Sequence, residues 1–353
     1  MSLQFLQNYQ GRRMRAYPNQ PLMEVPGDTT TDDADNAAGS PCIDHGLEYD
    51  AATWKAVDVR DADVNLDDVP RRFVDGSNVH EAVAWLRDPI GYPVPVVLAE
   101  LGGVCIRADG RELKREFAIV ERAVSMTIDP FPWNEVEGFA AALFEQGLRL
   151  IAARPPDDED GRPTMTFDFE RMREQTRVSV LHEMSCLEEV AWGHDREVPT
   201  IVDGRVGRFH RCGLSQYDVI GVIKQQRADY LHAEGWRVLY ELQPGHRTPA
   251  FVLPSKHLEV VSWYLKLDGA DGELPNWGIV RVEIPRARFA IRGDDFAYVD
   301  SLSRCILEMR CRRSSYARGP VSLDPIVRAE QSLRSLFSSI PALATHFYRM
   351  TGL

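Results

Sequence analysis

The chain has 353 residues, of which 44% are hydrophobic and 27% are charged, a balance typical of globular proteins that bury a sizeable core. No apolar run approaches the roughly 18 residues of a membrane helix, and the arginines near the N-terminus precede no apolar stretch of a secretory signal. We therefore expect a cytoplasmic protein with no membrane partner. The six cysteines form no CxxC pair, which disfavours both a disulfide framework and a structural zinc site.

The net charge of −12 is concentrated in one region. Residues 27–68 hold twelve acidic residues against only Lys55 and Arg60, so the rest of the chain is nearly neutral. A basic stretch at 304–318 carries five arginines against one glutamate. These arginines are Arg304, Arg310, Arg312, Arg313 and Arg318. The acidity therefore does not exclude nucleic acid as a partner, and the arginines form either an ordinary charged helix face or a phosphate-binding surface.

The predicted elements begin after an N-terminal extension. Residues 1–65 are acidic and mostly lack periodicity, so we expect a partly irregular extension followed by one domain over 66–353. The pattern then predicts a short strand at 71–79 that ends at Asp75, and a helical turn or loop at 80–91. The later elements are strands at 94–110 and 113–128, helices at 134–154 and 169–192, strands at 198–206, about 218–223, 260–267 and 277–285, and helices at 294–313 and 324–340.

This order of elements favours an α/β fold. Three strands precede the helices, and an aspartate ends both the first strand and the strand after the long helix. A ribonuclease H-like mixed sheet flanked by helices has this layout, and in such a sheet carboxylates from separate elements converge on metal ions. We expect that architecture here.

Two aspartates are candidate metal ligands because a short apolar run leads directly into each. These are Asp75 in RFVDGS and Asp203 in TIVDGR, although Asp268 in YLKLDG has a similar setting and Asp-Gly is a common turn pair. Mg²⁺ and Mn²⁺ prefer oxygen ligands, so a site needs further carboxylates. On the 169–192 helix Glu183 borders the apolar stripe and is our choice, while Glu174 and Glu188 are alternatives and Glu188 is expected to face solvent.

Eight segments, taken in order, resemble the NurA nuclease family, which has a ribonuclease H-like fold. The segments cover about residues 66–353. They are RRFVDGSN (71–78), the helix 169–192, TIVDGRVG (200–207), VIGVIKQ (219–225), PGHRTPAF (244–251), SWYLKL (262–267), WGIVRVEIP (277–285) and YARGPVSLDPIVRAEQSL (316–333).

The resemblance implies specific residue roles. It places metal-binding acids at Asp75, at an acid of the central helix for which we keep Glu183, and at Asp203. The lysine of the family's GxxK strand corresponds to Lys224, which would neutralise the scissile phosphate. Many members have a histidine where this chain has Glu330, which would replace it as a metal-binding or water-orienting residue, and His246 stands where an acid is expected.

The resemblance also implies an activity. The family's enzymes use two divalent ions, with Mn²⁺ favoured over Mg²⁺, for 5′→3′ exonuclease and single-strand endonuclease cleavage of DNA. They are homodimers that dock on a hexameric HerA-type ATPase, in DNA end resection and repair or in defence against phage. Two alternatives remain at this stage: a catalytically weak adaptor subunit of the HerA-type ring, and a nuclease directed at RNA.

Overall fold

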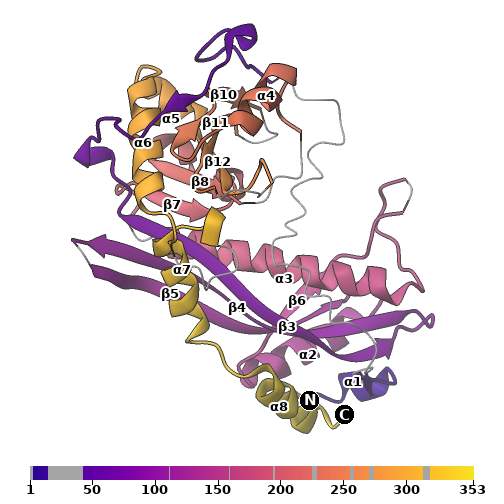
Figure 1. Ribbon diagram of the computed structural model, residues 1–353. Coiled ribbons are helices and arrows are strands. Elements are labelled where there is room, and N and C mark those ends of the chain that lie inside the picture. Colours follow the sequence, from indigo (N-terminus) through magenta and orange to yellow (C-terminus); the bar gives the residue numbers. More distant parts are fainter. Residues whose placement is uncertain are drawn as a thin grey trace.

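The computed structural model describes the chain except for residues 1–2, 15–42, 111, 159, 194, 225–228, 255–257, 270–273 and 313–318. Within the described residues, twelve strands form one mixed sheet, and helices cover both of its faces (Figure 1). The expectation of an α/β fold, with a large mixed sheet flanked by helices, is confirmed.

The strands are β1 (Arg12–Arg13), β2 (Val57–Asp58), β3 (Arg72–Arg87), β4 (Pro93–Asp109), β5 (Glu112–Thr127), β6 (Arg149–Ala153), β7 (Thr200–Asp203), β8 (Val219–Ile223), β9 (His246–Arg247), β10 (Phe251–Leu253), β11 (Val260–Lys266) and β12 (Ile279–Pro285). The α-helices are α1 (Phe5–Asn8), α2 (Trp133–Glu145), α3 (Phe169–Trp192), α4 (Ala233–Glu241), α5 (Arg286–Ile291), α6 (Phe296–Glu308), α7 (Asp324–Arg334) and α8 (Ile340–Thr351).

The sheet changes character at its centre. Its strands lie in the order β2-β9-β11-β12-β8-β7-β3-β4-β5-β6, with β1 beside β3 and β10 beside β11. The long strand β4 is antiparallel to both of its neighbours, β3 and β5. In contrast, β7 is parallel to β3, and β8 is parallel to β7. β3 and β7 are thus neighbours in the sheet, although β4, β5, α2, β6 and α3 lie between them in the sequence.

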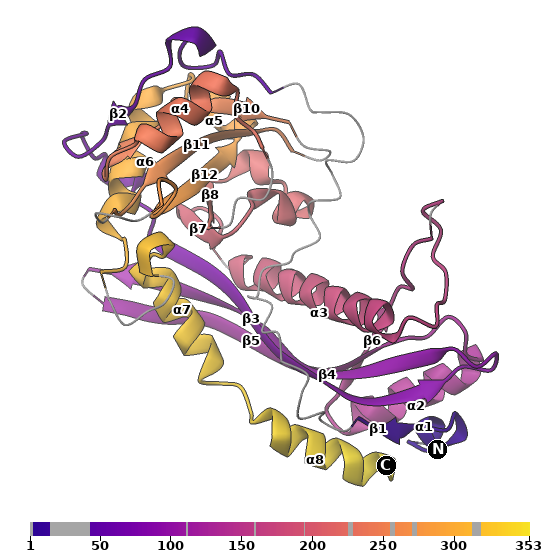
Figure 2. The same ribbon diagram turned by 45° about the vertical axis from the view of Figure 1, so that its right-hand side comes forward.

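Two helices pack on opposite faces of β3, because successive residues of a strand point to opposite sides of a sheet. Phe73 belongs to a buried cluster with Ile326 and Leu333 of α7. Val74, the next residue, belongs to a different buried cluster with Trp192 of α3. Figure 2 shows α3 and α7 on the two sides of the β3–β5 strands. The N-terminal end of β3, just before Asp75, is thus packed between two helices.

The first long strand differs from its prediction. It does not end at Asp75 but runs on to Arg87, so the helical turn or loop expected at 80–91 is wrong over most of its length. Hydrogen bonding to β4 continues along the whole strand, with one register shift between Ala82 and Ala84. This long-range pairing outweighs the weak local pattern of the segment.

Other boundaries also moved, whereas the long helix at 169–192 is confirmed at both ends. The helix predicted at 134–154 ends early, since Gly147 has a φ of 73°, and residues 149–153 form β6 beside β5. The helix predicted at 294–313 ends at Glu308. The one predicted at 324–340 ends at Arg334, and α8 follows it.

Parts of the N-terminal 65 residues pack against the rest of the protein. Phe5 and Leu6 are buried in the cluster that includes α2 and α8, and Trp54 is buried near α4. Glu48 forms a 2.8 Å ion pair with Arg247, and both side chains are almost fully buried. A domain boundary at residue 65 stays a prediction, but the described part of the extension contributes to the core.

Candidate active site

Asp75 and Asp203 lie next to each other on parallel strands. The ladder between β3 and β7 pairs Val74 with Val202, and the following residue on each strand is the aspartate. Neighbouring strands are about 4.8 Å apart, so the two carboxyl groups start from adjacent backbone positions. β7 ends at Asp203, whereas Asp75 lies inside β3 with β4 on its other side. The two aspartates chosen from the sequence are therefore brought together.

Glu188 of α3 is the third acid of this site. We call Asp75, Asp203 and Glu188 the acid group. Its side chain is only 3% exposed, and its carboxylate packs over Gly76, the residue after Asp75. A Cβ atom at position 76 would lie 2.6 Å from Glu188 Oε1, so the close approach requires glycine there. The helix thereby places a carboxylate beside β3.

A buried arginine joins two of these elements. Arg208, in the 3-10 turn Val206–Cys212, has its Nη1 3.2 Å from Glu188 Oε2, and its side chain is 8% exposed. Its Nη2 donates to the main-chain carbonyl of Asp203. Arg208 therefore ties the end of β7 to α3 at the acid group.

Lys224 follows β8 and reaches the same place. Its Nζ lies 2.6 Å from Asp203 Oδ2, and its side chain is 12% exposed. β8 is paired with β7 so that Asp203 faces Val222, which brings the lysine two residues later near the aspartate. The lysine chosen from the sequence thus belongs to the group.

Glu330 lies on α7, which packs on the face of β3 that carries Phe73, Asp75 and Ser77, opposite to the face of Gly76 and Glu188. It forms a 2.9 Å ion pair with Arg334, one helical turn later, and Arg334 Nε donates to Ser77 Oγ at 3.2 Å. Ser77 lies two residues after Asp75 and on the same face of β3. The negative charge of Glu330 acts on Asp75.

The electrostatics of the group centre on Asp75. Burial raises the pKa of its carboxyl well above the ordinary value, and the charge of Asp203 raises it further. Lys224 opposes this shift, while Glu188 and Glu330 add to it. A buried carboxylate beside other acids costs free energy unless a cation offsets it, so this position favours a proton or a positive ligand.

The acids expected on α3 are arranged differently from the prediction. Glu183 forms a 2.6 Å ion pair with Arg149 of β6, and Glu174 pairs with Arg177. The charge of Glu188, by contrast, is among the largest influences on the pKa of Asp75. The expectation that Glu188 faces solvent is wrong. A ligand role for Glu183 stays a prediction, but the structure brings Glu188, the alternative, to the aspartates.

A signal for Glu188 was present in the sequence. Leu181, Met184, Glu188 and Ala191 are spaced by three or four residues and so share one helix face. The other three are buried, and Glu188 continues their stripe toward the strand ends. For Arg208 the sequence gave no comparable pattern, because its place depends on the fold of a turn.

The arginines of the basic stretch do not form one described surface. Arg304 pairs with Glu308 at 2.9 Å, and Arg310 donates to the main-chain carbonyl of Leu307. Arg312 is exposed and lies 3.8 Å from Glu308. Arg313 and Arg318 lie outside the described residues. A DNA-binding role for the five arginines stays a prediction.

Asp75, Asp203 and Glu188 offer carboxylate oxygens, which are the ligands that hard divalent cations such as Mg²⁺ prefer. In the described part of the chain, however, no three His, Cys, Asp or Glu side chains are arranged closely enough to hold an ion. Glu188 and Asp203 instead pair with basic side chains. Cation binding would require these carboxylates to turn toward Asp75.

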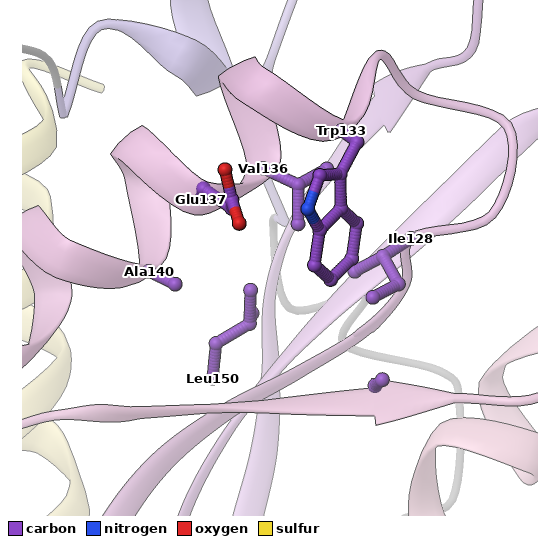
Figure 3. Close-up of a pocket in the computed structure, with 7 residues that line it drawn as sticks. Ile128, Trp133, Val136, Glu137, Ala140 and Leu150 are labelled. Carbon is purple, nitrogen blue, oxygen red and sulfur yellow. The ribbon is translucent and has the colours of Figure 1, made fainter.

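An apolar groove lies elsewhere in the protein. It has a volume of about 410 Å³ between α2 and the β5–β6 strands (Figure 3). Its lining residues are Ile128, Trp133, Val136, Glu137, Ala140, Leu150 and Ala152. Across the sheet, Asp75 is aligned with Ala118 of β5, and the groove residue Ala152 is paired with Met126 of the same strand. Eight residues of β5 therefore separate the groove from Asp75, which is about 27 Å along the strand. The groove is not part of the acid group.

No protein-family model and no curated protein matches the sequence. Among solved structures, the chain is similar to the NurA nuclease from Sulfolobus solfataricus, with 12% sequence identity and a TM-score of 0.35 over 79% of this chain and 81% of that chain. No described helix is long and apolar enough to span a membrane.

Proposed function

We propose that the protein is a metal-dependent nuclease whose active site is built on Asp75, Glu188 and Asp203. The observation that carries this proposal is that Asp203 of β7 and Glu188 of α3 lie near enough to Asp75 of β3 for their charges to act on its buried carboxyl group. Phosphodiester hydrolysis by divalent ions needs such converging carboxylates from rigid elements.

The order of the central strands supports a ribonuclease H-like architecture for this site. Strands β5, β4 and β3 are antiparallel, α3 follows them in the chain, and β7 and β8 are parallel to β3. The sequence predicted three strands, helices and further strands, and the structure adds β6 between α2 and α3 to that layout. In it the first strand and the strand after the helix each supply an aspartate.

A divalent ion at this site would polarise the phosphate and activate the attacking water. Asp75, Asp203 and Glu188 would hold Mn²⁺ or Mg²⁺, and two ions per site is our proposal from the family resemblance. Lys224, already beside Asp203, supplies positive charge where negative charge develops on the phosphate. Glu330 would orient water or take part in ion binding, the role that the family resemblance implies for it.

The substrate and the partners follow from the same resemblance. We propose DNA as the substrate, with 5′→3′ exonuclease and single-strand endonuclease activity. We also propose that the protein is a homodimer that works with a HerA-type hexameric ATPase, either in end resection and repair or in defence against phage.

A catalytically weak adaptor of such a ring is the second candidate. The observation in its favour is that Glu188 and Asp203 are paired with Arg208 and Lys224 rather than arranged around an ion. An adaptor needs the fold but not the acids.

End-labelled single-stranded DNA, duplex DNA and RNA, incubated with the purified protein in Mn²⁺, Mg²⁺ or EDTA, distinguish the candidates. We expect cleavage of DNA with Mn²⁺ that EDTA abolishes and that Asp203→Asn lacks. Equal, metal-independent background in the wild type and in Asp203→Asn would favour the adaptor, and preferential cleavage of RNA would redirect the substrate assignment.

A further inference from the structure

The four acids repel the phosphates of a nucleic acid, so the basic side chains around them contribute to how substrate is held. Three of them lie in direct contact with these acids. They are Arg208 on Glu188, Lys224 on Asp203 and Arg334 on Glu330. Each comes from a different element of the fold.

These three differ sharply in exposure. The side chains of Arg208 and Lys224 are 8% and 12% exposed, whereas that of Arg334 is 59% exposed. Arg208 and Lys224 therefore offer little of their charged groups to a phosphate beyond the one at the acids. Arg334 can contact a phosphate without any movement of α7, because it is the exposed last residue of that helix. The adjacent Leu333 is fully buried and holds this end of the helix in place.

The guanidinium of Arg334 is held from one side. Nε donates to Ser77 Oγ at 3.2 Å, and Nη2 lies 2.9 Å from Glu330 Oε1. An arginine has five N–H donors in a rigid fork, so these two contacts orient the group and leave donors to face solvent. Since Ser77 shares a face of β3 with Asp75, the guanidinium is fixed beside the reacting centre.

We propose that Arg334 is a phosphate-binding residue of this protein, which contacts a backbone phosphate of a single nucleic-acid strand next to the one that is cleaved. The proposal rests on the proposed nuclease function and adds to it a substrate-binding residue outside the basic stretch 304–318. Such a contact is independent of base sequence.

A structural role is the competing explanation. Arg334 also lies at the C-terminal end of α7, where a positive charge is favourable, and its contact with Ser77 joins α7 to β3. Ser77→Ala removes that contact but keeps the charge. Arg328 provides a matched control, because it is an exposed arginine on the same helix that contacts only Gln331 among the described residues.

The test is binding of a fluorescent single-stranded oligonucleotide to the full-length protein in EDTA, measured by anisotropy across a salt series. Each phosphate contact on a single strand contributes about 0.7 to the slope of log affinity against log salt. We expect Arg334→Ala to flatten the slope by about 0.7 and to weaken binding roughly tenfold at low salt. Arg334→Lys should keep the slope with weaker binding.

The controls separate the possible failures. Ser77→Ala keeps the charge of Arg334 but removes one contact that orients it, so it should retain the slope with somewhat weaker binding, whereas Arg328→Ala should retain both the wild-type slope and the wild-type affinity. A wild-type slope in Arg334→Ala, or an equal loss in Arg328→Ala, would overturn the assignment while leaving the nuclease proposal intact. Absence of any oligonucleotide binding by the wild type in EDTA would overturn this assignment, whereas the nuclease proposal is tested separately by cleavage in Mn²⁺.

Discussion

The carboxylate of Glu188 lies directly over Gly76, close enough that a Cβ atom there would be 2.6 Å from Oε1. The residue before this glycine is Asp75, whose neighbour across the parallel ladder is Asp203. One glycine thus allows a helix acid to join two strand acids. This contact connects the packing of α3 on the sheet to the proposed chemistry.

The first prediction concerns that contact. Gly76→Ala should push the Glu188 carboxylate away and abolish most cleavage, at a stability cost of about 1–3 kcal/mol for the overpacking. Gly138→Ala is the matched control, because a Cβ at this position in α2 meets open space. Cleavage rates and thermal melting of both variants check the prediction, and normal cleavage by Gly76→Ala would contradict it.

The second prediction concerns the protonation of Asp75. Its raised pKa means that the folded protein keeps a proton that the unfolded chain releases above pH ~4. The stability of the wild type should therefore fall as the pH rises through this window toward the raised folded pKa. Asp75→Asn lacks the effect, so in EDTA its melting temperature relative to wild type should increase between pH 4 and pH 8. A difference independent of pH would show that Asp75 is not perturbed.

The third prediction concerns the cation. If Mn²⁺ binds only the folded protein, a free Mn²⁺ concentration of a hundred times the dissociation constant should raise the free energy of unfolding by about 2.7 kcal/mol. The stabilisation should be absent in Asp75→Asn and Asp203→Asn, whose side chains cannot supply the anionic oxygens. Calorimetry or thermal melting with Mn²⁺ titrated into metal-free protein measures it. Equal stabilisation of the wild type and both variants would place the ion elsewhere.

The fourth prediction concerns Arg208. Removing one partner of a buried ion pair leaves the other charge uncompensated, which costs about 3–5 kcal/mol. Arg208→Ala should therefore melt well below the wild type, and Arg208→Lys should recover part of the loss. Arg205→Ala, at a neighbouring arginine that contacts the Tyr230 hydroxyl, should cost less. If Arg208→Ala melts like the wild type, Arg208 does not stabilise the acid group.

The sequence predicted the parts of the site that local patterns encode. Asp203 ends a short apolar strand and Lys224 follows another, and both patterns can be seen in a few residues. Asp75 was found in the same way, although its strand continues because pairing with β4 lies far away in the sequence. The α3 helix was predicted at both ends, since its periodicity is long.

The choice between glutamates of α3 depended on information that one helix does not contain. Both Glu183 and Glu188 border apolar residues, and only the position of β6 and β3 under the helix distinguishes them. Arg149 of β6 neutralises Glu183, while Gly76 of β3 leaves space for Glu188. β6 itself had been predicted as helix, so the partner of Glu183 could not be anticipated.

Cleavage of labelled single-stranded DNA in Mn²⁺ by Glu188→Gln and Glu183→Gln, side by side, tests the central claim most directly. Both changes remove one charge from α3 and keep the size of the side chain. We predict that Glu188→Gln loses nearly all activity, whereas Glu183→Gln, which only weakens an ion pair with Arg149, retains it. Full activity of Glu188→Gln, with or without loss in Glu183→Gln, would contradict an active site built on Asp75, Glu188 and Asp203.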